Sequence, residues 1–166
     1  TGIVDARILA PLIAQKKEVT DQLMESWVTD FASWDVCDQC CINLFRHHAT
    51  AFDKVTTWAA REEEFVRRAG FALLATLAVH KKQEPDQTFI DFFPLIEHYA
   101  FDNRNFVKKA VNWALRQIGK RNRNLNELAV KSCQRIIKQD TAPARWIAKD
   151  ALRELQDARI LARLKA

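Results

Sequence analysis

The stretch Phe65-Val66-Arg67-Arg68-Ala69 is followed 41 residues later by Phe106-Val107-Lys108-Lys109-Ala110, which repeats its order of aromatic, aliphatic, two cations and alanine. A second pair, Ala114-Leu115-Arg116 and Ala151-Leu152-Arg153, is offset by 37 residues. Periods of about 40 residues are typical of HEAT and armadillo repeats, in which each helix pair buries its apolar face against its neighbours. The repeats therefore predict an all-α fold, an α-α superhelix of HEAT-like antiparallel helix pairs in a right-handed curved solenoid.

Apolar residues recur at helical spacing on both sides of these repeats. The expected helices cover residues 4–14, 21–31, 34–47, 50–59, 62–81, 87–99, 105–118, 125–137 and 142–155, the last extending toward the C-terminus. Residues 82–86 form the clearest loop, and we expect Pro94 to bend the helix that contains it. Several helices begin after a residue suited to cap them: Thr20, Ser33, Thr50 and either Asp140 or Thr141.

The composition is that of one globular domain spanning residues 1–166. Apolar residues make up 48% of the chain, which is long enough to bury a core. Only 3 glycines and 4 prolines are present, too few for the many tight turns of an all-β fold. No apolar run approaches the ~20 residues of a membrane span, and residues 1–5 lack the basic start of a signal peptide. We therefore expect a cytoplasmic protein.

Charge is distributed unevenly along the chain. Residues 1–100 contain 10 Lys or Arg and 15 Asp or Glu, whereas residues 101–166 contain 16 Lys or Arg and 6 Asp or Glu. A basic C-terminal part indicates a polyanionic partner, with nucleic acid as the first candidate. The alternative is a solvated helical surface without a nucleic-acid partner.

Three cysteines, Cys37, Cys40 and Cys41, share the apolar stripe of one expected helix. On such a stripe a thiol packs as a small hydrophobic group, and we expect these thiols to be reduced and buried. A metal site with His47 and His48 is the alternative interpretation. It is the weaker one, because structural zinc usually binds two well-separated ligand pairs.

Five tryptophans stand out in a chain of this length. Trp27, Trp58 and Trp146 lie on apolar stripes, so we expect them to fill the core. Trp34 begins its helix, and Trp113 lies within a basic one. These two are candidates for contact with a ligand.

Trp34 and Asp38 are four residues apart, which places an indole and a carboxylate on one helix face. The alternative is that Trp34 packs on a neighbour, Asp38 is merely exposed, and Asp35 is a first-turn acid favoured by the helix dipole. The surroundings of Trp113 are basic, and an indole among cations suits nucleic acid because cations meet phosphate and the ring meets base or sugar. The alternative here is a core tryptophan on a helix with a charged outer face.

Three motifs together resemble the DNA alkylation repair enzyme family, the HEAT-like-repeat DNA glycosylases. They are Ser33-Trp34-Asp35-Val36-Cys37-Asp38, then Phe65-Val66-Arg67-Arg68-Ala69, then the segment 108–116 that contains Trp113. The resemblance runs from about Trp27 to the C-terminus. Family members usually carry further N-terminal helices that help to grip the duplex, whereas this chain has one or two helices before Trp34. The family also has a tryptophan where this chain has Phe65.

The resemblance implies a glycosylase that excises cationic N3- and N7-alkylated purines from double-stranded DNA, with the lesion kept in the duplex. Matched to the family motifs, the catalytic positions are Trp34, Asp38, Arg68 and Trp113. The two indoles would stabilise positive charge on the base through cation–π contacts. Asp38 would stabilise the oxocarbenium-like sugar and position water, while Arg68 would hold a backbone phosphate. No metal, cofactor or covalent nucleophile is implied.

Further cations of this chain are expected to grip DNA phosphates: Arg67, Lys108, Lys109, Arg116, Lys120, Arg121, Arg123, Arg145 and Lys149. We expect the protein to act as a monomer. Two other functions fit the same sequence. A non-catalytic DNA-binding repeat protein of this family would bind duplex without releasing a base, and a protein-interaction scaffold would not bind DNA at all.

Overall fold

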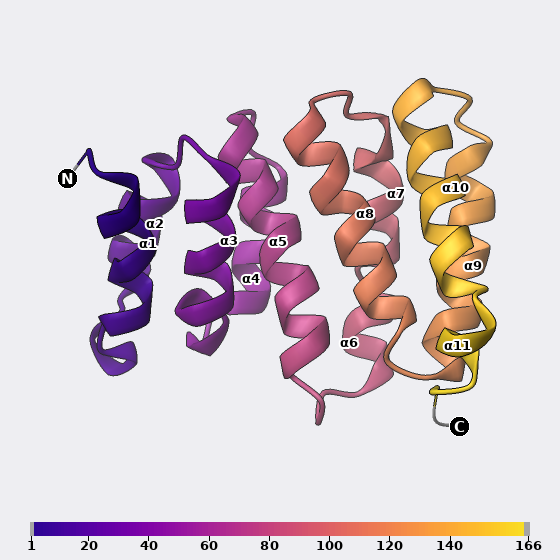
Figure 1. Ribbon diagram of the computed structural model, residues 1–166, viewed down its shortest axis with the longest axis horizontal. Coiled ribbons are helices and arrows are strands. Elements are labelled where there is room, and N and C mark those ends of the chain that lie inside the picture. The colour runs from indigo at the N-terminus through magenta and orange to yellow at the C-terminus, as the bar shows by residue number, and fades with distance from the viewer. Residues whose placement is uncertain (1, 165–166) are drawn as a thin grey trace. The chain divides into compact units, whose positions relative to one another are not determined.

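The computed structural model describes residues 2–164, and all regular secondary structure within that range is helical (Figure 1). The chain divides into two compact units, Thr1–Leu77 and Ala78–Ala166. The grouping of both units into one domain stays a prediction. Within residues 2–164, no helix combines the length and the hydropathy that a membrane crossing requires.

Unit 1 is built from stacked helix pairs. Its α-helices are α1 (Val4–Ile13), α2 (Asp21–Thr29), α3 (Trp34–Asn43), α4 (Ala51–Ala59) and α5 (Glu64–His80), of which the last three residues belong to unit 2. α2 and α4 lie side by side, because Glu25 of α2 accepts from Lys54 at 2.9 Å and from the Trp58 indole at 2.8 Å. α1, α3 and α5 form the other layer (Figure 1). This arrangement of alternate helices in two layers is the one that the repeats predict.

The core of unit 1 is aromatic where α4 packs against the turn that follows α3. Phe45 and Trp58 are fully buried, with ring centroids 5.6 Å apart. Gly70 allows α4 and α5 to approach closely, since a Cβ there would lie 2.7 Å from the backbone nitrogen of Ala59 and 2.9 Å from the carbonyl oxygen of Val55. Only glycine fits at such a backbone contact.

Unit 2 repeats the two-layer arrangement. Its helices are α6 (Asp86–Ile90), α7 (Phe93–His98), α8 (Asn105–Gly119), α9 (Arg123–Ile137), α10 (Ala142–Leu155) and α11 (Ala158–Leu161). α8 and α10 lie side by side, with the Asn112 amide donating to Asp150 at 2.7 Å, and α9 packs on both. In the second layer Arg135 of α9 pairs with Glu97 of α7 at 2.7 Å. Both contacts join residues 38 positions apart, close to the repeat offset in the sequence.

Three expected helices are shorter or more divided than the apolar pattern indicates. Residues 34–47 form α3 and a separate 3₁₀ turn, Phe45–His47, because Leu44 leaves the helical conformation at φ −124° and ψ −64°. Residues 87–99 form two helices, and Pro94 lies in the first turn of α7 instead of bending a continuous helix. That position suits proline because its missing N–H has no partner there. The last long helix ends at Leu155, so its expected extension to the C-terminus is wrong.

Two of the expected N-caps are confirmed and two are not. Thr20 accepts from the backbone N–H of Leu23 at 3.1 Å, and Thr141 accepts from that of Ala144 at 3.3 Å. Ser33 and Thr50 occupy cap positions, but their hydroxyl groups bond instead to the aspartates Asp35 and Asp21 respectively. The sequence therefore predicts where these helices begin. It does not predict that the hydroxyl groups of Ser33 and Thr50 donate to nearby carboxylates.

Candidate functional site

The first turns of α3 divide its residues between the core and the outer surface. Cys37, Cys40 and Cys41 are at most 1% exposed, which confirms that these thiols are core groups. Trp34 and Asp38 are four positions apart and share a face, which adjoins the stripe of Cys37 and Cys41, and Asp38 is half-buried there. The Trp34 side chain is 52% exposed and therefore available to a ligand.

Asp38 meets a guanidinium from α5. Arg68 Nη2 lies 2.7 Å from Oδ2 of Asp38, and Arg68 Nε donates to Oδ1 at 3.0 Å. The two side chains are only 7% and 14% exposed, so the bidentate pair is largely shielded from water. Arg68 was expected to hold a DNA phosphate. Its guanidinium is instead directed at Asp38 and buried, which makes it the group that positions the carboxylate.

Two cysteines of α3 contact the backbone of α5 close to this ion pair. The Cys37 thiol contacts the carbonyl oxygen of Phe65 at 3.8 Å, and the Cys41 thiol contacts that of Ala69 at 3.6 Å. Small side chains at these positions let α3 approach the backbone of α5 closely. Burial raises the pKa of Cys40 to about 12, with the nearby Cys37 thiol adding to the shift, so Cys40 is a poor nucleophile.

The pKa values of the two aspartates of α3 are shifted in opposite directions. Burial raises the pKa of Asp38, although the hydrogen bonds and the charge of Arg68 offset part of the effect. Asp35 accepts from the Ser33 hydroxyl at 2.5 Å and from the Val36 N–H at 2.8 Å, and these bonds lower its pKa. Paired carboxylates with diverging pKa values are typical of a site in which one group has a chemical role. Asp38 is the candidate for such a role, and Asp35 stabilises the start of the helix.

In unit 2, Trp113 lies half-buried on the outer face of α8. With the Gln117 amide in the orientation that satisfies its neighbours, its oxygen accepts from the Trp113 indole N–H at 3.1 Å and from Lys120 at 3.3 Å. The indole is therefore held along its own helix. Each unit thus carries part of the expected catalytic set, and their assembly around one lesion stays a prediction.

Several cations expected to bind DNA are already engaged within the protein. Arg116 and Lys120 both pair with Glu154 of α10. Arg121 donates to two backbone carbonyl oxygens at 2.6 and 3.1 Å, and its guanidinium lies 4.0 Å from the ring centroid of Phe89. This contact network ties Arg121 to the loop after α5, so its role is structural and the expected phosphate contact is not supported.

Arg67 and Arg145 also have intramolecular partners. Arg67 is half-buried and donates from Nε to the carbonyl oxygen of Ala59 at 2.9 Å, which joins α5 to α4. Arg145 pairs with Asp140 at 2.5 Å, but both side chains are exposed, so the pair is weak and the guanidinium remains accessible. Of these two arginines, only Arg145 is placed to meet a phosphate.

Of the remaining cations of the expected set, Lys108 is half-buried and the other three are exposed. Lys109, Arg123 and Lys149 have no ion-pair partner within residues 2–164. Lys108 places its ammonium 4.9 Å from the centroid of the Trp146 ring. The exposed lysines of α8 and α10 that lack an ion-pair partner are therefore Lys109 and Lys149.

The three tryptophans expected in the core have different environments. Trp58 is 1% exposed, as predicted, whereas Trp146 is 39% exposed and its assignment to the core is wrong. The sequence carried a signal for this position, because Trp146, Lys149 and Arg153 are spaced for one helix face. An indole that shares its face with cations faces solvent.

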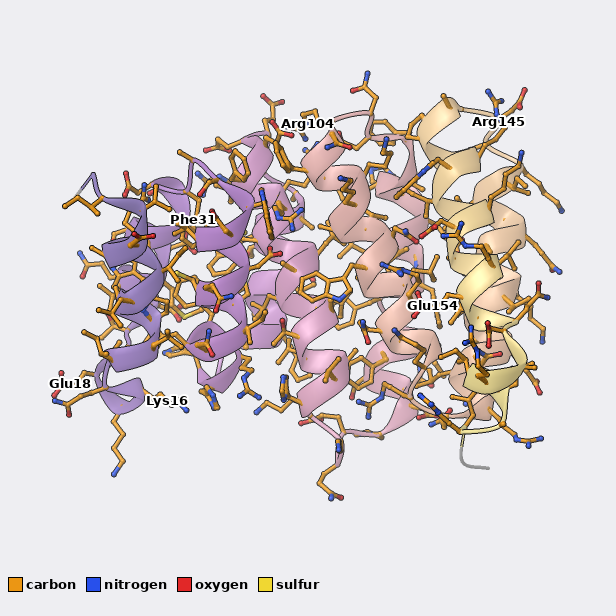
Figure 2. The ribbon with its side chains drawn as sticks, in the orientation of Figure 1. Lys16, Glu18, Phe31, Arg104, Arg145 and Glu154 are labelled. Carbon is orange, nitrogen blue, oxygen red and sulfur yellow. The ribbon has the colours of Figure 1, made fainter. Side chains whose placement is uncertain are left out.

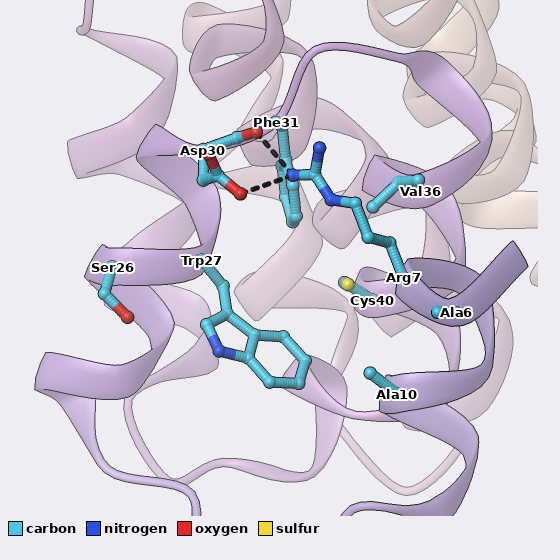
Figure 3. A pocket seen from close by; sticks show the side chains of 9 residues that line it. All are labelled: Ala6, Arg7, Ala10, Ser26, Trp27, Asp30, Phe31, Val36 and Cys40. Atoms are coloured by element: carbon cyan, nitrogen blue, oxygen red, sulfur yellow. Dashed lines mark hydrogen bonds and ion pairs between the residues drawn. The ribbon is translucent and has the colours of Figure 1, made fainter. Parts of the chain in front are cut away.

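Trp27 is half-buried and lines a pocket of about 280 Å³ between α1, α2 and α3 (Figure 3). Cys40 contributes to the same lining, and Arg7 reaches over to Asp30, where Nη2 donates to Oδ2 at 2.7 Å. Helical geometry places this pocket on the side of α3 away from Asp38. The core assignment of Trp27 is therefore only partly correct, and the pocket is separate from the Asp38–Arg68 pair.

A family model described as DNA alkylation repair enzyme matches residues 1–155. The chain belongs to the DNA alkylation repair enzyme family. It is also similar to a solved structure described as "a new family of proteins related to the HEAT-like repeat DNA glycosylases with affinity for branched DNA structures". That likeness covers 95% of this chain and 70% of the other, with a TM-score of 0.74 and 18% identity, and it confirms the predicted all-α, HEAT-like fold. None of the curated proteins matches the chain.

Proposed function

We propose that this member of the DNA alkylation repair enzyme family binds double-stranded DNA and hydrolyses the N-glycosidic bond of cationic N3- or N7-alkylated purines. The observation that carries the proposal is the shielded Asp38–Arg68 pair beside the exposed indole of Trp34. A carboxylate that is poorly solvated but held in a fixed orientation interacts strongly with a cation that enters the site. The family supports DNA repair as the setting.

Departure of the base from this substrate needs little acid catalysis. An alkylated purine of this class carries a positive charge, so it leaves as a neutral base together with the electrons of the bond to C1′. The site has to stabilise cationic character on the base and the sugar. An exposed indole such as Trp34 supplies about 0.5–2 kcal/mol of cation–π stabilisation, more when the contact is desolvated.

Asp38 acts on the sugar side of the same bond. As the bond to the base breaks, positive charge develops at C1′, and the carboxylate stabilises it electrostatically. A water molecule attacks C1′ and gives up a proton, which Asp38 accepts. Its raised pKa makes it a better proton acceptor than an exposed aspartate. Arg68 fixes the carboxylate through two hydrogen bonds and is a positioning residue.

Unit 2 carries DNA-binding groups of its own. Its half-buried Trp113 is the second indole that the family resemblance implies. Lys109 and Lys149, which are exposed on α8 and α10, bind backbone phosphates. Neither a metal nor a covalent nucleophile takes part in the proposed reaction.

Release of 7-methylguanine and 3-methyladenine from methylated duplex DNA tests the proposal. We expect the unaltered protein to release base, and Asp38→Asn to lose most of that activity because the carboxylate charge is gone. Asp35→Asn is the matched control, since it alters an aspartate of the same helix that only stabilises the first turn. Absence of base release by the unaltered chain, or equal activity in Asp38→Asn, would refute the catalytic assignment.

A second candidate function is DNA binding without base removal. It is favoured by the similar solved protein, whose description gives affinity for branched DNA structures. The closed Asp38–Arg68 pair is compatible with it, because both groups already satisfy each other. In that case a four-way junction would bind more tightly than a linear duplex, and Asp38→Asn would leave the affinity unchanged.

A further inference from the structure

The outer face of α10 carries an exposed tryptophan between cations. Trp146, Lys149 and Arg153 follow one another at intervals of three and four residues, so they share one side of the helix. The Trp146 side chain is 39% exposed, whereas tryptophans are on average among the well-buried residues. No function has yet been assigned to this ring.

The contacts between α8 and α10 place Trp146 relative to Trp113 of the proposed site. The N-terminal ends of both helices, near Arg104 and Arg145, lie at the same end of unit 2 (Figure 2). Trp146 is level with Lys108, whose ammonium nitrogen lies 4.9 Å from the centroid of the Trp146 ring. Trp113 is five residues further along α8, or about 7–8 Å along the axis, on a helix whose axis is about 8–10 Å away. The two helices lie side by side, and Trp146 is exposed on α10 while Trp113 is half-buried on α8.

Two lysines near Trp146 are not neutralised, whereas Arg145 and Arg153 of α10 pair with Asp140 and Asp150 respectively. At the C-terminal half of the α8–α10 pair, Glu154 forms ion pairs with both Arg116 and Lys120. At the N-terminal half, Lys109 and Lys149 are exposed and have no acidic partner in the described part of the chain. The N-terminal ends of α8 and α10 add the positive ends of two helix dipoles.

The residues Lys108, Lys109, Trp146 and Lys149 are called the Trp146 patch below. Its chemistry matches single-stranded nucleic acid, in which cations follow the phosphates and an indole stacks on a base. In a paired duplex the base faces are covered by stacking, so only sugars, phosphates and groove edges are accessible. An exposed indole among cations gains most from a base that has left the stack.

We infer that the Trp146 patch is a binding subsite for an unpaired nucleotide of DNA. A base stacks on the exposed part of the Trp146 indole, while Lys109 and Lys149 contact the phosphates that flank it. Lys108 holds the indole in place through its cation–π contact. The inference rests on the DNA binding in the proposed function and does not require base removal. The preferred substrate is then DNA with unpaired nucleotides, such as a gap or the base of a branch.

Binding of the full chain to two labelled DNAs tests the subsite. One probe is an unmodified duplex, and the other is the same sequence with a short single-stranded gap. We expect Trp146→Ala to weaken binding to the gapped DNA about tenfold, as loss of one base–aromatic stack does, and to change binding to the duplex less than about twofold. Trp146→Phe keeps most of the affinity, whereas Trp146→Leu behaves like the alanine variant because it lacks an aromatic face.

The controls separate stacking from folding and from the proposed catalysis. Ile137→Ala removes another exposed apolar side chain of unit 2 and should change neither affinity. Far-UV circular dichroism checks that each variant is folded. An equal loss for both DNAs, or wild-type affinity of Trp146→Leu for the gapped probe, would overturn the inference. Base release, measured separately on methylated duplex, decides the glycosylase proposal independently of this ratio.

Discussion

Replacing Arg68 by methionine should destabilise the protein strongly, since it leaves the Asp38 carboxylate buried without its partner. The pair is bidentate, and its side chains are only 7% and 14% exposed. Removing one partner of such a buried pair costs about 3–5 kcal/mol. For a chain of this size, that loss corresponds to a fall in the melting temperature of roughly 6–20 °C. Methionine has a similar length to the arginine stem, so little of the loss comes from a cavity.

The double variant Asp38→Leu/Arg68→Met provides the matched control. It removes both charges, so we expect it to recover most of the lost stability. Urea unfolding followed by circular dichroism measures the free energy of unfolding of all the variants. A loss below about 1 kcal/mol in Arg68→Met would show that the pair behaves as an exposed one. In that case the argument that Asp38 is poorly solvated fails, and so does the basis for its proposed chemistry.

Acidification gives a second test of the same pair. The pKa of Asp38 is raised in the folded protein, so the folded state binds the proton more tightly than the unfolded state does. The charged form of Asp38 therefore lowers stability above its folded pKa, and this effect disappears as the pH falls through that value. Without Arg68 the pKa rises further. The stability deficit of Arg68→Met should thus be largest at neutral pH and shrink toward about pH 4–5.

Three further outcomes follow from the packing. Gly70→Ala should lower the free energy of unfolding by about 1–3 kcal/mol, because the added Cβ would meet the backbone of Ala59 at 2.7 Å, and urea unfolding measures the loss. Thr141→Ala should cost about 1 kcal/mol in the same assay, since it removes the hydrogen bond to the N–H of Ala144, whereas Thr141→Ser should cost much less. Cys40, with a pKa of about 12, should resist a thiol reagent at pH 8 in the folded protein and react in urea; rapid labelling of folded protein would contradict its burial.

The sequence predicted the helices and their faces well, because hydrophobic periodicity depends on local geometry. It placed Trp34 and Asp38 together and the cysteines in the core of α3, as the structure confirms. Its repeat offsets of 41 and 37 residues are also close to the 38 positions that separate Asn112 from its partner Asp150. These features follow from the 3.6-residue turn and from stacking of similar units.

The partners of charged groups were not predictable in this way. Arg68 was assigned to a phosphate through the family resemblance, whereas its contact with Asp38 joins residues 30 positions apart, and a helical pattern carries no information about such a pair. Arg121 was assigned to DNA because it lies in the basic C-terminal part, although its donors bind backbone carbonyl oxygens. Trp146 was misplaced because its apolar ring outweighed the lysine and arginine that share its face. Periodicity identifies a face, but tertiary contacts decide which charges on it remain available.

Glu154 has a consequence for the way ionic strength would affect complex formation. Its carboxylate already forms ion pairs with Arg116 and Lys120. These two cations can therefore release counterions from DNA only if a phosphate first displaces the carboxylate. The slope of affinity against salt concentration then reflects the uncompensated lysines of α8 and α10 and not the formal charge of residues 101–166. A Glu154→Gln variant would steepen that slope although it adds no basic residue.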